Sequence, residues 1–215
     1  MSEKTTPLPE LRIGHVRGVV LHKWQRTWEE RYRNPLLIRE VSDEEQLSGL
    51  RDGSLDMCFV RLPIDRDGLH AIPLYEEQMV AWVAKDHAIA AADEVTLAEI
   101  AELDDTVLTE LDAIALDRVL AGAVLVVPMS IARGASRRDL VFRPVTDAEP
   151  SPVALAWRVD SEHPLIDEFV GVVRGRSADS SRTQKERATS RTRPAPARPR
   201  SRNRRSHPPK VRRGH

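Results

Sequence analysis

The sequence has little cysteine, few aromatic residues and no long apolar run. Its one cysteine, Cys58, cannot form an intramolecular disulfide, and the apolar residues around it at 55–60 are typical of a buried structural thiol. No stretch approaches the roughly 18 apolar residues of a membrane-spanning helix, and residues 1–10 have no apolar segment typical of a secretion signal. We therefore expect a cytoplasmic protein with no membrane partner.

Motifs for metal binding and catalysis are also absent. The seven histidines show no metal-ligand spacing, and there is no HExxH, GxSxG or phosphate-binding glycine loop. Ser130 follows an apolar strand, where a nucleophile could lie, but a helix cap or a pocket-lining hydroxyl fits it better. We expect no cofactor, no metal and no enzymatic activity. An enzyme on a binding-protein scaffold is the disfavoured alternative, because no acid, base and nucleophile are assembled.

Charge is unevenly distributed, although 33 basic and 33 acidic residues cancel overall. From residue 174 onward there are 15 Lys or Arg and two acidic residues, a net charge of +13, whereas residues 1–173 carry −13. The basic segment is rich in Arg, Ser and Pro and has almost no aliphatic side chains to bury. We expect a flexible N-terminus at 1–9, a folded acidic body at 10–173 and a disordered basic tail at 174–215.

The last part of the tail, residues 191–215, has ten Lys or Arg and no acidic residue. Such a segment attracts nucleic acid by counterion release, independently of sequence, and it has no base-reading helix or aromatic motif. Binding to nucleic acid, binding to the acidic body and a solubilising role all remain open. Under the first interpretation, the nucleic-acid-binding residues are Arg191, Arg193, Arg198, Arg200, Arg202, Arg204, Arg205, Lys210, Arg212 and Arg213.

Hydrophobic periodicity predicts a β-α-β-α-β run in the first third of the chain. The expected elements are strands at 11–16, 36–38 and 55–62, a helix over 20–32 and a short helix beginning at Ser42. Short connections between such elements imply parallel pairing with right-handed crossovers. Trp24, Trp28 and Tyr32 form one helical stripe, which favours a core or dimer-facing role over a base-stacking platform.

The same criteria predict shorter elements in the rest of the body. The expected strands are 69–74, 78–84, 107–108, 124–127, 140–145 and 153–159. The expected helices are 97–102, 116–120 and 165–173, and residues 130–135 are expected to form a helix or a turn. Thr96 is well placed to cap the first of these helices.

Six segments then occur in a characteristic order: LRIGHVRG, WEERYRNPLLIREV, EEQLSGLRDGSLDMCFVR, DGLHAIPLYEEQMVAWVAKDHAIA, VTLAEIAELD and VLAGAVLVVPMSIAR. In this order, over roughly residues 10–173, the chain resembles the effector-binding domain of LysR-type transcriptional regulators. The most specific pieces are residues 50–56, residues 73–77 followed by 86–87, and residues 121–122 leading into 126–128.

The resemblance implies an α/β fold like that of type 2 periplasmic-binding proteins, with two lobes and mixed, mainly parallel sheets. Lobe I would comprise 10–78 and 153–173, and lobe II 79–152. Two departures stand out: the helix-turn-helix that precedes this domain in the family is absent from the sequence, and lobe II is short between the strand at 107 and residue 121. The resemblance also implies a homodimer through lobe I.

Ligands of open α/β sheets bind beyond the carboxyl ends of strands, and the family's ligand contacts fall at these turns. The predicted ligand-binding residues are therefore His15, Arg17, Gly18, Arg61, Pro63, Pro128, Met129 and Ser130. Arginine donors beside a helix N-terminus would favour a small carboxylate. The alternative is that Arg17 and Arg61 pair with carboxylates of the acidic body.

Two functions are carried forward from the sequence. The first is a small-molecule-sensing, regulator-like protein that is tethered to nucleic acid nonspecifically by its tail. The second is a cytoplasmic small-molecule-binding protein with no role on nucleic acid.

Overall fold

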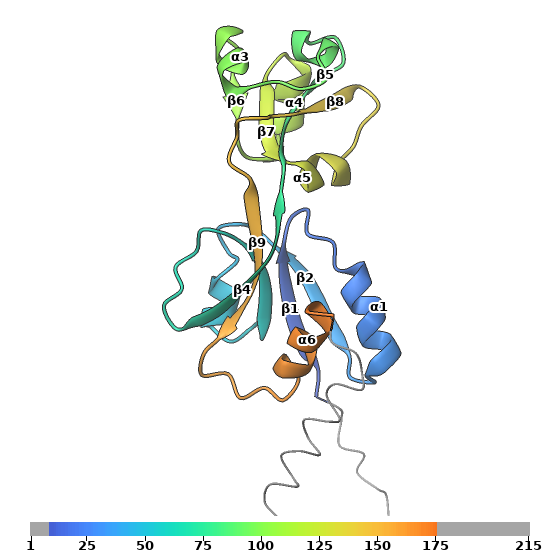
Figure 1. The fold of residues 1–215 in the computed structure, drawn as a ribbon, viewed down its shortest axis with the longest axis vertical. Coiled ribbons are helices and arrows are strands. Elements are labelled where there is room, and N and C mark those ends of the chain that lie inside the picture. Colours follow the sequence, from blue (N-terminus) through green and yellow to red (C-terminus); the bar gives the residue numbers. More distant parts are fainter. Residues whose placement is uncertain (1–8, 176–215) are drawn as a thin grey trace, which may run out of the picture. The chain divides into compact units, whose positions relative to one another are not determined.

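The computed structural model describes residues 9–175 (Figure 1). The predicted nucleic-acid-binding positions of the tail lie outside these residues, as does most of the predicted N-terminal segment 1–9. Within the described part, the strands form a five-stranded sheet in the order β2-β1-β3-β9-β4 and a four-stranded sheet in the order β6-β7-β5-β8. No helix in residues 9–175 is long and apolar enough to cross a membrane.

The first sheet combines strands from both ends of the described chain. Its strands are β1 (Leu11–Val16), β2 (Leu36–Val41), β3 (Met57–Arg61), β4 (Leu69–Glu77) and β9 (Ser151–Arg158). Every residue of β3 is buried, as expected for a strand covered on both faces. Cys58 in β3 has no exposed surface, which confirms that it is a buried thiol.

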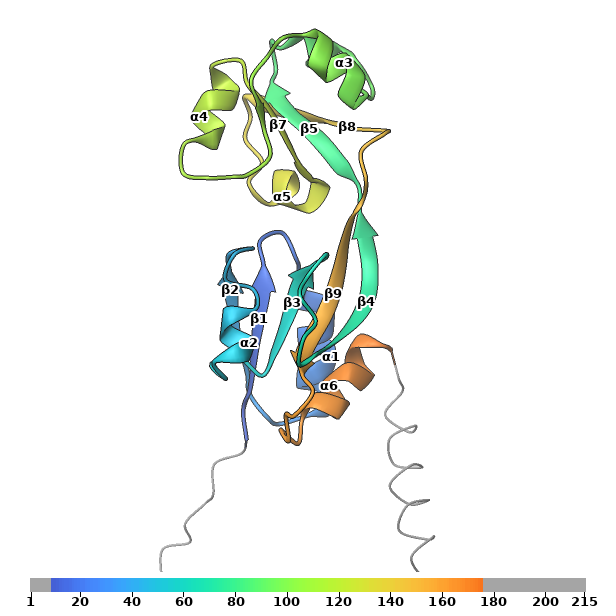
Figure 2. The same cartoon turned by 90° about the vertical axis from the view of Figure 1, so that its left-hand side faces the viewer.

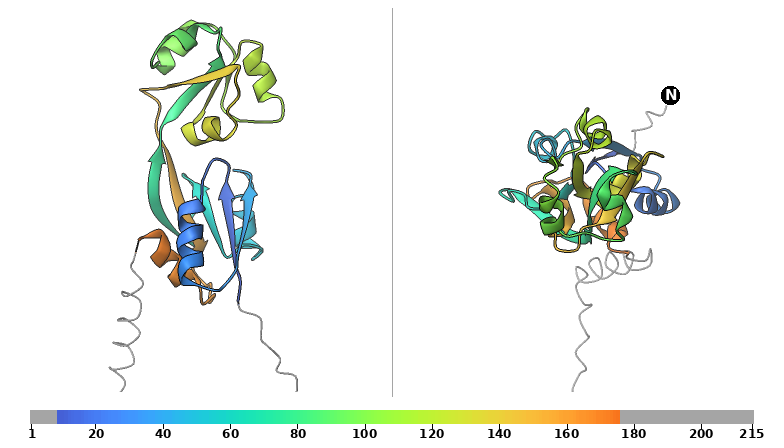
Figure 3. Two further views of the ribbon diagram at one scale, coloured as in Figure 1. Left: turned by 90° about the vertical axis from the view of Figure 1, so that its right-hand side faces the viewer. Right: turned by 90° about the horizontal axis from the view of Figure 1, so that it is seen from above.

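Helices cover both faces of this sheet. They are α1 (His22–Arg31), α2 (Ser48–Arg51) and α6 (Ile166–Val173). Helices α1 and α6 lie on one face and α2 on the other (Figures 2 and 3). Trp28 of α1 packs against Phe169 of α6 with their ring centroids 5.7 Å apart. Trp24 and Trp28 are 6% and 1% exposed, so the aromatic stripe is confirmed as part of the core.

The second sheet uses a continuous segment of chain. Its strands are β5 (Met79–Ala84), β6 (Val107–Leu108), β7 (Val124–Pro128) and β8 (Leu140–Pro144). Its helices are the 3-10 helix η1 (Ala88–Ala91), α3 (Leu97–Glu102), α4 (Ala115–Leu120) and α5 (Met129–Gly134). The predicted cap at Thr96 is confirmed, because Thr96 and Glu99 form a reciprocal capping box.

Strand pairing is mixed, as the family resemblance implies, but it is not mainly parallel. Strand β1 pairs in parallel with β2 and β3, and β6 with β7. The other four pairings are antiparallel. The expectation of mainly parallel sheets was wrong because β9 returns antiparallel between β3 and β4. The expected lobe boundaries remain predictions.

Candidate ligand-binding site

The two sheets are joined by two chain crossovers that lie beside each other. Strand β4 ends at Glu77 and β5 begins at Met79, so only Gln78 separates them. Strand β9 begins at Ser151, which is the register partner of Glu77. Figure 2 shows these segments running between the two sheets near the ends of β1 and β3. Polar side chains at these positions can therefore contact both sheets.

Arg61, the last residue of β3, is the centre of a buried polar cluster at the crossovers. Its Nη1 donates to Glu77 Oε2 at 2.6 Å and to Ser151 Oγ at 3.1 Å. Its Nη2 donates to the carbonyl oxygen of Arg17 at 2.8 Å. The side chains of Arg61 and Glu77 are each only 9% exposed. Within the described residues, Arg61 Nε is buried with no hydrogen-bond partner, so one donor remains unsatisfied.

Glu77 connects this cluster to the second sheet. Ser130, in the first turn of α5, donates its hydroxyl hydrogen to Glu77 Oε2 at 2.8 Å. The same carboxylate oxygen therefore accepts from Arg61 and from Ser130. We define the Arg61–Glu77 cluster as Arg61, Glu77, Ser130, Ser151 and the Arg17 carbonyl group.

The turn that follows β1 closes one side of the cluster. Gly18 has φ +88, and a Cβ atom there would lie 2.5 Å from Ser130 Oγ. The neighbouring Arg17 guanidinium donates to the Leu111 carbonyl at 2.8 Å and lies 3.5 Å from Glu40. The Arg17 and Glu40 side chains are both half exposed, so this ion pair is a weak one.

The predicted ligand-binding residues fall into two groups in the structure. Arg17, Gly18, Arg61 and Ser130 meet at the Arg61–Glu77 cluster. In residues 9–175 the other four make no hydrogen bond to it. The His15 ring nitrogen Nδ1 instead lies 3.2 Å from the adjacent Val16 carbonyl oxygen. The four are His15, Pro63, Pro128 and Met129.

Two residues of the cluster were not predicted from the sequence. Glu77 belongs to the segment 73–77 that carries part of the family resemblance, yet no role was assigned to it. The available signal was a glutamate between two apolar strands, where a buried carboxylate needs a partner. Ser151 gave no such signal, because its position depends on the pairing of β9 with β4.

Tyr75 of β4 lies in the electrostatic field of the cluster. Burial, with a further contribution from the negative charge of Glu77, raises the pKa of Tyr75 to about 12, while Arg61 acts in the opposite direction. The phenol therefore stays protonated at neutral pH. It adds a neutral, half-buried neighbour to the ion pair.

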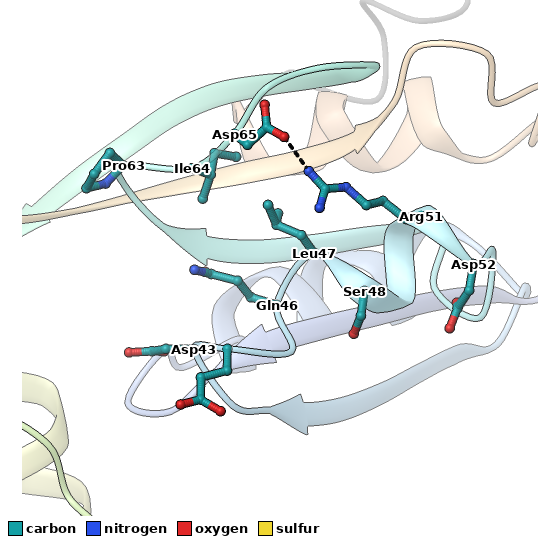
Figure 4. Close-up of a pocket in the computed structure, with 10 residues that line it drawn as sticks. Asp43, Gln46, Leu47, Ser48, Arg51, Asp52, Pro63, Ile64 and Asp65 are labelled. Carbon is teal, nitrogen blue, oxygen red and sulfur yellow. Dashed lines mark hydrogen bonds and ion pairs between the residues drawn. The ribbon is translucent and has the colours of Figure 1, made fainter.

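A separate hollow of about 690 Å³ lies beside α2 (Figure 4). Of the eight predicted residues, only Pro63 lines it. Arg51 and Asp65 form an ion pair of 2.6 Å across its rim. Its remaining charged residues, Asp43, Glu44 and Asp52, are all acidic. This hollow is open and acidic, unlike the buried ion pair at the crossovers.

Among the described residues, the Arg61–Glu77 cluster contains hydrogen-bonding groups but no acid, base and nucleophile assembled for catalysis. The Ser130 hydroxyl donates to Glu77 Oε2, an atom that already accepts from Arg61 Nη1. Among residues 9–175, no group of three or more His, Cys, Asp or Glu side chains is placed to hold a metal ion. Ligand sites occur preferentially where two structural units meet, and the chain crosses between the two sheets at this cluster.

Residues 6–110 match the family model described as the LysR substrate binding domain. The chain therefore carries a LysR substrate-binding domain over those residues. A "Probable hydrogen peroxide-inducible genes activator" of Mycobacterium avium is 33% identical over 75 residues, 35% of this chain. That alignment covers 24% of the relative, so the chain spans about a quarter of the regulator it matches.

Solved structures share the fold at low sequence identity. The BenM effector binding domain with its effector benzoate has a TM-score of 0.65 and 18% identity, covering 88% of this chain and 97% of that one. The OxyR regulatory domain of Pseudomonas aeruginosa has a TM-score of 0.62 and 22% identity, covering 77% of this chain and 96% of that one. The fold is therefore that of LysR-type effector-binding domains beyond residue 110 as well.

Proposed function

We propose that this protein senses a small molecule through the Arg61–Glu77 cluster and acts as a regulator rather than as an enzyme. The observation that carries the proposal is the single Glu77 oxygen that accepts hydrogen bonds from Arg61 of the first sheet and Ser130 of the second. A ligand that bonds to either donor changes the connection between the two sheets. Ligand binding and a change of conformation are then coupled.

The chemistry of a similar protein supports a small organic effector. The effector of the BenM effector binding domain is benzoate. In this chain, Arg17, Gly18, Arg61 and Ser130 would line the ligand, with His15, Pro63, Pro128 and Met129 as outer positions. The positive charges of Arg17 and Arg61, taken alone, suggest a small carboxylate as the effector. Both arginines, however, also lie beside glutamates of the chain, Glu40 and Glu77.

A thermal-shift screen of small organic molecules on the full chain tests this function. We expect at least one compound to raise the melting temperature, because a ligand specific for the folded state stabilises it. The Ser130→Ala variant should respond less to that compound, whereas Asp160→Asn, in an exposed ion pair with Arg158, should respond like the wild type. An equal response in all three proteins would show that the ligand binds elsewhere.

Peroxide sensing, suggested by the name of the Mycobacterium avium relative, does not fit the thiol of this chain. Cys58 is its only cysteine, and burial raises the pKa of Cys58 to about 12. Peroxide reacts with an accessible thiolate. A fully buried, protonated thiol without a second cysteine offers neither the reactive form nor a disulfide partner.

The basic tail would tether the sensor to nucleic acid. Its ten Lys or Arg between residues 191 and 215 would release counterions from a polyanion without reading bases. In this proposal the protein is cytoplasmic and dimeric, and the tail supplies a nonspecific contact. If nucleic acid is not retained even at low salt, the alternative is a small-molecule-binding protein with no nucleic-acid role.

A further inference from the structure

We propose that Glu77 determines the charge class of the effector: by occupying the anion-binding side of Arg61, it makes the cluster select an uncharged, hydrogen-bonding molecule and reject carboxylates. This inference rests on the proposed function, because it assigns the ligand class of the same site. The inferred preference for an uncharged ligand is the opposite of the preference for a carboxylate that Arg17 and Arg61 alone suggest.

Glu77 holds the position that a ligand carboxylate would take. Its Oε2 lies 2.6 Å from Arg61 Nη1, a distance typical of a strong charge-assisted hydrogen bond. Ser130 Oγ also donates to this atom, at 2.8 Å. These are the contacts by which an arginine and a hydroxyl usually bind a carboxylate ligand. The chain therefore supplies its own carboxylate to the site.

A second carboxylate at Arg61 would meet the negative charge of Glu77 in a buried setting. Both side chains of the pair are 9% exposed, so water screens the repulsion poorly. The ion pair is neutral overall and leaves no net positive charge to attract an anion. Like-charge repulsion of this kind should weaken a carboxylate at least roughly tenfold relative to a neutral molecule of the same shape.

Arg17 does not restore the missing positive charge. Its guanidinium donates to the Leu111 carbonyl and lies 3.5 Å from Glu40. The part of Arg17 that enters the cluster is its carbonyl oxygen, which accepts from Arg61. Arg17 therefore adds an acceptor to the cluster and directs its charge elsewhere.

A neutral ligand can still use the hydrogen-bonding groups of the cluster. Arg61 Nε is a buried donor without a partner in the described residues. Ser130 and Ser151 carry hydroxyl groups that can donate or accept. An amide or a hydroxyl-bearing molecule offers both an acceptor and a donor without adding charge. This is the chemical class that the cluster favours.

Chemical rescue of the Glu77→Ala variant tests whether Glu77 occupies an anion site. Removing the carboxylate leaves Arg61 buried and unpaired, so formate should bind in its place. We expect formate to raise the melting temperature of this variant by roughly 3 to 6 °C at a concentration tenfold above its dissociation constant. The wild type and Glu76→Ala, which lacks only the exposed neighbouring carboxylate, should respond no more to formate than to equal sodium chloride.

Formamide is the matched neutral control for formate in the same titration. The proposal is overturned if the Glu77→Ala variant responds equally to formate and formamide, or if the wild type responds to formate as strongly as the variant. Should Glu77→Ala be unfolded in buffer, recovery of its native circular dichroism on adding formate, but not formamide, is the equivalent result.

Benzoate and benzamide, which differ in charge but hardly in shape, test ligand selection directly. In the wild type we expect any response to be larger for benzamide, and Glu77→Gln should shift the ratio of affinities toward benzoate by at least tenfold. A wild type that prefers benzoate overturns the inference. If neither compound binds, the formate result alone decides it. A formate rescue together with an effector screen without hits would contradict the proposed sensing function but not the anion site.

Discussion

Gly18 and Ser130 meet where the turn after β1 approaches the first turn of α5. A methyl group on Gly18 would lie 2.5 Å from Ser130 Oγ and 3.0 Å from a side-chain carbon of Ile131. The backbone of Gly18 is also in the left-handed region, at φ +88, which other residues adopt only with strain. Two independent constraints therefore require glycine at this contact between the sheets.

The first prediction concerns the substitution Gly18→Ala. We expect it to lower the free energy of unfolding by about 2 to 4 kcal/mol, since backbone strain and steric overlap add. Gly68→Ala is the control, because Gly68 has φ +67 but no atom within 4 Å of its added Cβ, so it carries the strain alone. Urea denaturation measures both variants. If both variants lost the same unfolding free energy, the steric overlap of the added Cβ with Ser130 would contribute nothing to the loss at Gly18.

The second prediction concerns Asp56, which accepts hydrogen bonds from Arg12 N at 2.8 Å, Nε at 3.0 Å and Nη2 at 2.6 Å. Burial raises the pKa of Asp56, but the hydrogen bonds and charge of Arg12 outweigh it, so the pKa is lowered overall. The pair therefore stabilises the fold above the unfolded pKa of about 3.9. This stabilisation is lost as pH falls through the lower folded value.

We accordingly expect Asp56→Asn to cost about 1 to 3 kcal/mol of unfolding free energy at pH 7. The difference from the wild type should shrink below about pH 4. Denaturation at a series of pH values checks this. Asp160→Asn, in the exposed pair with Arg158, should show no comparable loss at any pH. A difference for Asp56→Asn that stays constant with pH would contradict the account.

The third prediction concerns the core aromatic Trp28. Its ring stacks on Tyr32 at 4.2 Å, and its Nε1 donates to the Asn34 carbonyl at 2.7 Å. We expect Trp28→Ala to cost about 3 to 5 kcal/mol, because it leaves a cavity and an unpaired carbonyl. Val20→Ala, at a position 64% exposed, should change stability by less than about 0.5 kcal/mol. Chemical denaturation followed by circular dichroism compares the two.

The fourth prediction concerns the reactivity of Cys58. With its pKa raised to about 12 by burial, the thiol should react with a disulfide reagent at pH 8 far more slowly than free cysteine. In about 6 M guanidinium chloride the reaction should reach the free-thiol rate. Absorbance of the released product measures both rates. Rapid labelling of the native protein would show that β3 opens readily.

The fifth prediction concerns the basic tail. Residues 174 and 175 donate backbone hydrogen bonds to the last turn of α6, so truncation should follow Gly175 rather than precede it. The truncated protein should keep its circular dichroism and lose retention of random-sequence DNA in a gel-shift assay. The full chain should lose roughly a thousandfold or more in affinity between about 50 and 200 mM salt. Retention by the truncated protein would place the contact in the folded body.

The local elements were largely predictable because they depend on nearby residues. Predicted bounds for β1, α3 and β6 agree with the structure. Alternation marks β1, and the Thr96 cap marks the start of α3. Helix α2 begins at Ser48, later than its sequence signal at Ser42 suggested. The Ser42 hydroxyl accepts from Glu45 N within a turn that precedes the helix. The capping signal was real, but it stabilised a turn.

Pairing between distant segments was not predictable from periodicity. The pattern of β9 predicts an apolar strand, yet nothing in residues 151–158 indicates that it lies between β3 and β4. The role of Glu77 depends on the same pairing, which places Ser151 opposite it. The sequence left open whether Arg61 binds a ligand or pairs with a carboxylate of the acidic body. The structure confirms the pairing, with Glu77 as the partner, but no sequence pattern had identified that glutamate.

The position of β9 also bears on how the chain folds during synthesis. The second sheet consists of the continuous segment 79–144, whereas the first lacks the strand between β3 and β4 until residues 151–158 have left the ribosome. Contacts between distant segments form late because their loop closure is entropically costly. The later part of the chain should therefore complete its sheet first, and the earlier part should wait for β9 to join its strands.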